Sequence, residues 1–108
     1  MTLEQFKTQL DTLNIPVAYM AFAEAQEPPF LVYYEDASNN FFADNTVHKR
    51  ISEITVELYT KFKDTTLEGQ LEDLLGRWQK SSSYVPEEKL LLTAYSFSTE
   101  LDEAVISA

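Results

Sequence analysis

Residues 54–60 alternate between aliphatic side chains and polar or aromatic ones. Successive side chains of a β-strand point to opposite faces, so this period of two predicts a strand with one buried and one wet face. A second strand is predicted at residues 30–34, where Phe30, Val32 and Tyr34 would share a face. A half-buried sheet needs another layer on its apolar side, and we expect helices to supply that layer.

Two amphipathic helices are predicted before and after these strands. Thr2 with Gln5 three residues later forms a capping box, and Pro16 ends the helix that follows. Thr65 and Glu68 repeat the capping pattern, and residues 81–83 are expected to close the second helix. The apolar positions at helical spacing are Leu3, Phe6, Leu10 and Leu13 in the first helix, and Leu67, Leu71, Leu74, Leu75 and Trp78 in the second.

A β-hairpin is predicted after the second helix, with a turn at residues 86–89 between a short strand at 83–85 and a long one at 90–97. Residues 17–22 are either a short strand or an extended connection, because so short an apolar run has no decisive periodicity. The predicted fold class is α+β, a small mixed or antiparallel sheet covered by two α-helices in the order α-β-β-β-α-β-β.

The length of 108 residues predicts one domain. We place its boundaries at residues 1–99, with a short acidic C-terminal tail at 100–108. The N-terminal residues lack the basic and apolar regions of a signal peptide, and no stretch approaches the roughly 18 apolar residues that span a bilayer. We therefore expect a soluble intracellular protein.

The charge balance is strongly acidic, with 18 Asp and Glu against 8 Lys and Arg and a formal net charge of −10. Such a surface repels phosphate backbones and anionic lipids, which disfavours binding of nucleic acids or membranes through a basic patch. The chain contains no cysteine, so disulfide bonds and thiolate metal sites are excluded.

No catalytic or metal-binding constellation is visible in the sequence. His48 is the only histidine, and no cysteine or second histidine accompanies it to form a nucleophile relay or a zinc site. The carboxylates lack the spacing of an EF-hand loop, and Trp78 is interpreted as a core residue on the second helix. We therefore predict a protein that is not an enzyme, with no cofactor and no catalytic, cofactor-binding or metal-binding residues.

Phe41 and Phe42 follow a segment rich in turn formers, which puts two large aromatic side chains in an exposed loop or hairpin tip. Exposed aromatic residues of this kind anchor many protein interfaces. Either these two rings fold back onto the core, or a partner covers them.

The order and spacing of several blocks across nearly the whole chain resemble the tail-completion, or tail-terminator, proteins of long-tailed phages and prophages of Gram-positive bacteria. Each block alone is ordinary strand or cap chemistry, and the succession is what is similar. The blocks are IPVAY at 15–19, PPFLVY at 28–33, ADN at 43–45, ELYTKFKD at 57–64, LE at 67–68, KS at 80–81 before Tyr84, EEKL at 87–90 and YSF at 95–97.

This resemblance implies an α+β subunit that forms a hexameric ring on the end of the tail tube, stops its polymerisation and joins it to the head. The implied partners are other copies of this chain, the major tail protein and the head-tail connector or adaptor proteins, with DNA passing through the lumen without specific binding and no membrane. The implied location is the tail or neck of the virion, and the host cytoplasm during assembly. Phe41, Phe42 and Asp44 would lie on an assembly loop.

Two other functions remain open at this stage. A head-closure or head-tail connector protein of the phage neck would share the size and ring symmetry of a tail terminator. An acidic DNA-mimic inhibitor would share the net charge, although its carboxylates should form a ladder, whereas the lysines and arginines of this chain are scattered among the acids.

Overall fold

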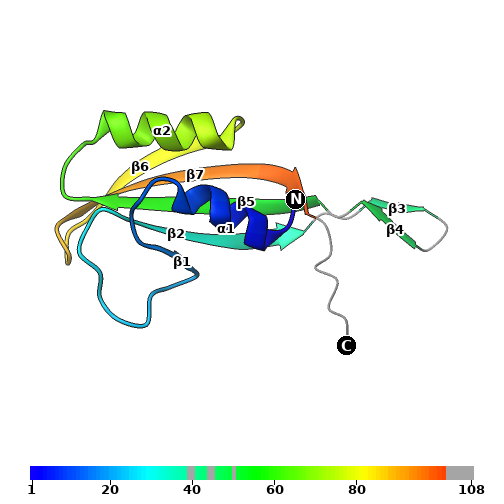
Figure 1. Cartoon of the computed structure of the whole chain (residues 1–108), viewed down its shortest axis with the longest axis horizontal. Helices are drawn as coiled ribbons and strands as arrows, with labels where there is room; N and C mark the ends of the chain where they lie inside the picture. Colours follow the sequence, from blue (N-terminus) through cyan, green and yellow to red (C-terminus); the bar gives the residue numbers. More distant parts are fainter. Residues whose placement is uncertain (39–40, 44–45, 50, 102–108) are drawn as a thin grey trace.

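The computed structural model describes residues 1–38, 41–43, 46–49 and 51–101 of the chain. These residues form an α+β fold with a five-stranded mixed sheet and two helices, as the sequence predicts (Figure 1). The elements are α1 (Leu3–Asp11), β1 (Val17–Tyr19), β2 (Phe30–Ser38), β3 (Phe41–Ala43), β4 (Thr46–Lys49), β5 (Ile51–Thr60), α2 (Thr65–Leu75), β6 (Gln79–Val85) and β7 (Leu90–Glu100).

The five-stranded sheet has the order β1-β2-β5-β7-β6. Strand β5 lies at its centre and pairs antiparallel with β2 on one side and with β7 on the other. The hairpin of β6 and β7 is confirmed, and β1 runs parallel to β2 at one edge. The predicted order of elements omitted β3 and β4. These two strands form a separate two-stranded sheet between the end of β2 and the start of β5.

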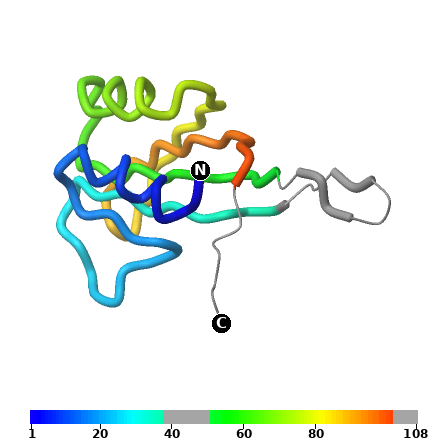
Figure 2. The backbone as a smooth tube through the Cα atoms, turned by 45° about the vertical axis from the view of Figure 1, so that its right-hand side comes forward, coloured from blue at the N-terminus to red at the C-terminus, as the bar shows by residue number. Residues whose placement is uncertain are grey.

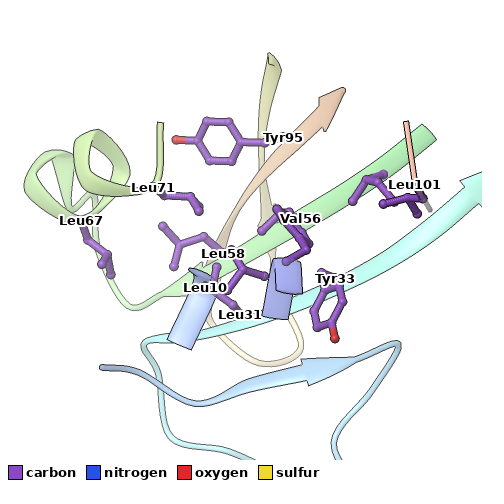
Figure 3. Close-up of a cluster of buried hydrophobic side chains, with 11 residues drawn as sticks. Leu10, Leu31, Tyr33, Val56, Leu58, Leu67, Leu71, Tyr95 and Leu101 are labelled. Carbon is purple, nitrogen blue, oxygen red and sulfur yellow. The ribbon is translucent and has the colours of Figure 1, made fainter. Parts of the chain in front are cut away.

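Both helices cover the same face of the sheet, and the main core lies beneath them (Figures 1 and 3). Leu10 of α1 and Leu71 of α2 are fully buried there. The ring of Phe6 meets Tyr33 edge-on, with 5.8 Å between the ring centroids. The buried members of this core are Phe6, Leu10, Leu31, Tyr33, Ile54, Val56, Leu58, Leu67, Leu71, Tyr95 and Leu101.

Helix α1 begins with the predicted capping box. The Gln5 backbone N–H donates to Thr2 Oγ1 at 3.1 Å, and the Thr2 backbone N–H donates to Gln5 Oε1 at 2.9 Å. The helix ends at Asp11, ahead of Pro16, and Asn14 then takes a left-handed conformation with φ of 59°. The long loop between β1 and β2 projects away from the strands of the sheet, at the lower left of Figure 2.

The predicted ends of α2 were wrong at both termini. Its N-cap is Asp64, whose side chain accepts from the Leu67 backbone N–H at 3.0 Å, so Thr65 is the first helical residue rather than the cap. The helix ends after Leu75, where Gly76 takes a positive φ of 77°. Glycine is suited to this position because a residue with a side chain would be strained in that conformation. Trp78 therefore follows the helix and is 38% exposed, and residues 81–83 belong to strand β6.

A buried polar cluster fastens α2 to β6 and β7. Glu68 of α2 is only 4% exposed, and its carboxylate accepts from Lys80 of β6 at 2.6 Å and from Lys63 at 2.9 Å. Lys80 also binds Glu72 at 2.8 Å, and the Tyr95 hydroxyl donates to the same Glu72 oxygen at 2.7 Å. We call Glu68, Glu72, Lys80 and Tyr95 the helix clamp.

The helix clamp keeps both of its carboxylates ionised. Burial by itself would raise the pKa of Glu68, but the hydrogen bonds and charges of Lys80 and Lys63 outweigh it and hold that pKa below its usual value. The hydrogen bond from Lys80, followed by that from Tyr95, lowers the pKa of Glu72. The two carboxylates in turn raise the pKa of Lys80, so the ammonium group stays charged.

The chain remains in the core beyond the predicted domain boundary at residue 99. Glu100 is the last residue of β7, and the Leu101 side chain is 8% exposed against the main core. The first two residues of the expected tail therefore belong to the folded domain, and residues 102–108 lie outside the described part of the chain.

We predict that Lys80→Met lowers the free energy of unfolding by about 3 kcal/mol, because it leaves the buried Glu68 carboxylate without its shorter ion pair. The double variant Glu68→Met, Lys80→Met should recover most of that loss, since no charge is then stranded. Urea unfolding followed by circular dichroism at neutral pH measures both values. A double variant no more stable than the single one would contradict the prediction.

The same cluster sets a pH dependence of stability. Because the pKa values of Glu68 and Glu72 are lower in the folded chain than the ordinary 4.5, their contribution is present above that pH and is lost as the pH falls below it. Glu68→Gln should flatten the acid limb of the stability curve, whereas the exposed Glu4→Gln control should leave its shape unchanged.

Candidate functional site

The structure places Phe41 and Phe42, two of the three predicted assembly residues, in one strand of a β-hairpin. Phe41 and Phe42 belong to β3, where their backbone partners in β4 are Lys49 and Val47. The side chains of this hairpin, and the whole of Asp44, lie outside the described part of the chain. The assembly role of these three residues therefore stays a prediction.

The sheet face opposite the helices is covered by neither of them. Residues that are paired across an antiparallel sheet share a face. The strand register therefore shows that every second side chain of β2, β5, β7 and β6 belongs to this surface. A second, smaller core of Phe30, Val32 and Leu90 lies on it, and in the described residues no helical side chain joins this core. We call this surface the uncovered face. It carries Phe30, Val32 and Tyr34 of β2, Thr55, Glu57 and Tyr59 of β5, Leu90, Leu92 and Ala94 of β7, and Ser81 and Ser83 of β6.

A carboxylate held between two tyrosines lies at the centre of the uncovered face. The hydroxyl groups of Tyr59 and Tyr34 donate to the two oxygens of Glu57 at 2.9 and 3.2 Å. Burial raises the pKa of Tyr59, and the hydrogen bond to Glu57 raises it further. Burial, followed by the charge of Glu57, raises the pKa of Tyr34. Both phenols therefore remain protonated donors to the Glu57 carboxyl group, which lies between them.

Aromatic rings extend from this carboxylate toward the loop between β1 and β2. Tyr59 stacks on Phe30, with 4.8 Å between the ring centroids and 18° between the ring planes. Phe22 of the loop meets Phe30 edge-on at 5.5 Å. The loop is thus attached to the uncovered face by ring contacts, at the end of the sheet where β2 begins and β5 ends.

A groove of about 750 Å³ runs between this loop and the sheet. Four carboxylates and two ammonium groups line it together with aromatic rings, so its charge balance is negative. The charged lining residues are Glu24, Glu27, Glu57, Glu88, Lys61 and Lys89, and the aromatic ones are Phe22, Phe30 and Tyr59. We call this site the acidic groove. Carboxylates beside ring faces suit a ligand that carries cationic and apolar groups together.

A second hollow, of about 820 Å³, lies where α2 turns into β6. Arg77 and Trp78 line it from the turn, with Asp36, Glu53 and Phe97 from the sheet. Its charged groups are of both signs, so it favours no one class of ligand by charge.

The two outer strands of the sheet differ in length and chemistry. Within the described residues, β1 and β6 each pair with a strand on one side only. The three residues of β1 form a short edge, whereas the seven of β6 form a long edge that includes three consecutive serines. Edge strands often carry charged side chains that prevent pairing with another chain. In β6, the ammonium group of Lys80 instead forms ion pairs with Glu68 and Glu72 of the helix clamp. The β6 edge is therefore open to pairing.

In the part of the chain that the structure describes, no group of three or more His, Cys, Asp or Glu side chains could hold a metal ion. No helix among those residues is long and apolar enough to cross a membrane. The side chain of His48 lies outside the described part. That the chain is not an enzyme stays a prediction.

No protein-family model matches this chain, and no curated protein is similar to it in sequence. The function proposed below therefore rests on geometry, on charge and on the resemblance described above.

The acidic groove and the tyrosine-held carboxylate were missed by the sequence reasoning. Glu57 and Tyr59 are two residues apart in a predicted strand, so their common face was visible in the pattern. Tyr34 could be added only with the strand register, which pairs it with Thr55 beside Glu57. Glu24 and Glu27 lie between β1 and β2, and nothing in their local sequence shows that this loop packs on the sheet.

We predict that Tyr59→Phe lowers the free energy of unfolding by about 1 kcal/mol at neutral pH, because it removes a hydrogen bond to a charged acceptor and keeps the ring stack. The exposed Tyr84→Phe is the matched control and should change stability little. Because the pKa of Tyr59 is raised in the fold, its contribution is present below the ordinary value of 10.0 and is lost as the pH rises above it.

Chemical denaturation at neutral pH and at a series of pH values above 10.0 measures both effects. The decline in stability above pH 10.0 should be shallower in Tyr59→Phe than in the wild-type chain. Identical alkaline declines in the wild-type chain and Tyr59→Phe would contradict the assignment.

Proposed function

We propose that this chain is a structural protein of phage morphogenesis, a tail terminator that closes as a ring on the end of the tail tube and joins it to the head connector. The observation that carries the proposal is the pair of dissimilar sheet edges, β1 and β6, on opposite sides of one small domain. No catalytic role is proposed for it.

A closed ring of identical subunits uses heterologous contacts, in which two different patches of each subunit meet. The short β1 edge and the long β6 edge are two such patches, separated by the full width of the sheet. Strand addition at an open edge gains backbone hydrogen bonds and demands little of the side chains, which suits the serine-rich β6. The subunit thus has the surfaces that a ring requires.

The charge of the chain supports a role around DNA without binding to it. A net charge of −10 disfavours adhesion to a phosphate backbone. In a ring at the neck of a virion, acidic residues on the inner wall would let DNA pass without sticking. The major tail protein and a head-tail connector or adaptor would contact the two ends of the ring, and the tail or neck of the virion is the proposed location.

The test is electron microscopy of particles from a phage or lysogen in which the gene for this chain is deleted. We expect tails of abnormal and variable length that are unattached to filled heads, with normal tails restored by the wild-type gene. Normal-length tails beside empty or leaking heads would overturn the tail-terminator role and assign the chain to head closure.

Complementation of the deletion with variants separates assembly from folding. Phe41→Ser, Phe42→Ser should fail to restore tail length, while Phe62→Ser, at a 72% exposed position, is the control and should restore it. Circular dichroism of the purified variants checks that both still fold. An unfolded Phe41→Ser, Phe42→Ser chain would show that these rings belong to the core and would overturn their assembly role.

A further inference from the structure

We infer that the β3–β4 hairpin of one copy docks in the acidic groove of a second copy. This inference rests on the proposed function in one respect, namely that copies of this chain assemble with one another. It adds a second pair of contact surfaces, the hairpin and the acidic groove, to the β1 and β6 edges of the proposed ring.

The chemistry of the hairpin complements that of the acidic groove. Lys49 and Arg50 are the only adjacent pair of basic residues in the chain, and they lie at the end of β4 and directly after it. Phe41 and Phe42 supply two aromatic residues in the paired strand β3. The groove offers four carboxylates and three aromatic rings, which are the partners that cations and aromatic side chains prefer.

The hairpin is too far from the groove of its own chain to occupy it. It leaves the sheet where Ser38 of β2 faces Ser52 of β5, whereas the groove lies where Phe30 faces Tyr59 at the other end of the same strands. Eight residues of strand separate Phe30 from Ser38, which corresponds to about 27 Å. The 12 residues between Ser38 and Ile51 make at most two arms of six, which reach only about 20 Å when fully extended. A hairpin that fills a groove must therefore fill that of another copy.

The contact that results is heterologous. One copy gives its hairpin at one end of β2 and β5 and receives a neighbour's hairpin at the other end. Such contacts propagate from copy to copy until they close into a ring. Long-range attraction between the basic pair and the acidic groove would also orient the copies before they meet.

The test uses introduced cysteines, because the natural chain has none. Full-length chain with Thr46→Cys in β4 is mixed at high concentration with ¹⁵N-labelled chain that carries Ala25→Cys in the lining of the groove. The control replaces the second protein with Gln70→Cys, at an exposed position of α2. Copper–phenanthroline is added as the thiol oxidant, and mass spectrometry follows the mixed disulfide. We expect it to form about tenfold faster with Ala25→Cys than with Gln70→Cys.

Charge reversal checks the complementarity itself. Adding Lys49→Glu and Arg50→Glu to the first protein should slow the mixed disulfide to the control rate. Adding Glu24→Lys and Glu27→Lys to the second protein as well should restore it, and high salt should weaken the difference. Equal rates for Ala25→Cys and Gln70→Cys would overturn the inference, as would a fast cross-link whose rate neither charge reversal changes.

The outcome is independent of the tail phenotype. A fast, charge-dependent cross-link together with normal tails in the deletion strain would keep the hairpin contact and reject the tail terminator. Abnormal tails together with control-rate cross-linking would keep the tail terminator and reject the hairpin contact.

Discussion

The burial of both helices against one face of a single sheet is the constraint on which the rest of this domain depends. Leu10 and Leu71 are fully buried on that face. The apolar sides of α1 and α2 pack there and contribute nothing to the opposite face. The opposite face has to be stabilised by its own side chains. It holds a carboxylate between two tyrosines, with a ring stack and an attached loop that forms the acidic groove.

In the proposed ring, the helix clamp would connect stability to assembly. Lys80 is directed toward α2 to neutralise two carboxylates, one of them buried. The same geometry removes from the β6 edge the charge that commonly prevents strand pairing. A single lysine therefore holds the second helix in place and leaves a long, serine-rich edge available to another chain. In the proposed ring, stability and assembly would therefore depend on the same lysine.

The sequence predicted the elements whose side-chain pattern reflects one buried face, and failed where tertiary contacts decide. Residues 54–60 and the Thr2 capping box were predicted correctly because alternation and capping are local. Strand β6 is wet on both faces and has no alternation, so only its pairing with β7 makes it a strand. Trp78 fell on the helical spacing of the leucines by coincidence, because Gly76 had already ended α2. The acidic groove depends on strand register and loop packing, which no local pattern encodes.

The measurement that tests the central claim most directly is a cryo-electron microscopy map of the neck of particles that carry this chain. A tail terminator predicts one closed ring of this chain at the head-proximal end of the tail tube. Density for this chain at another position, or particles that lack it altogether, would contradict the proposed function.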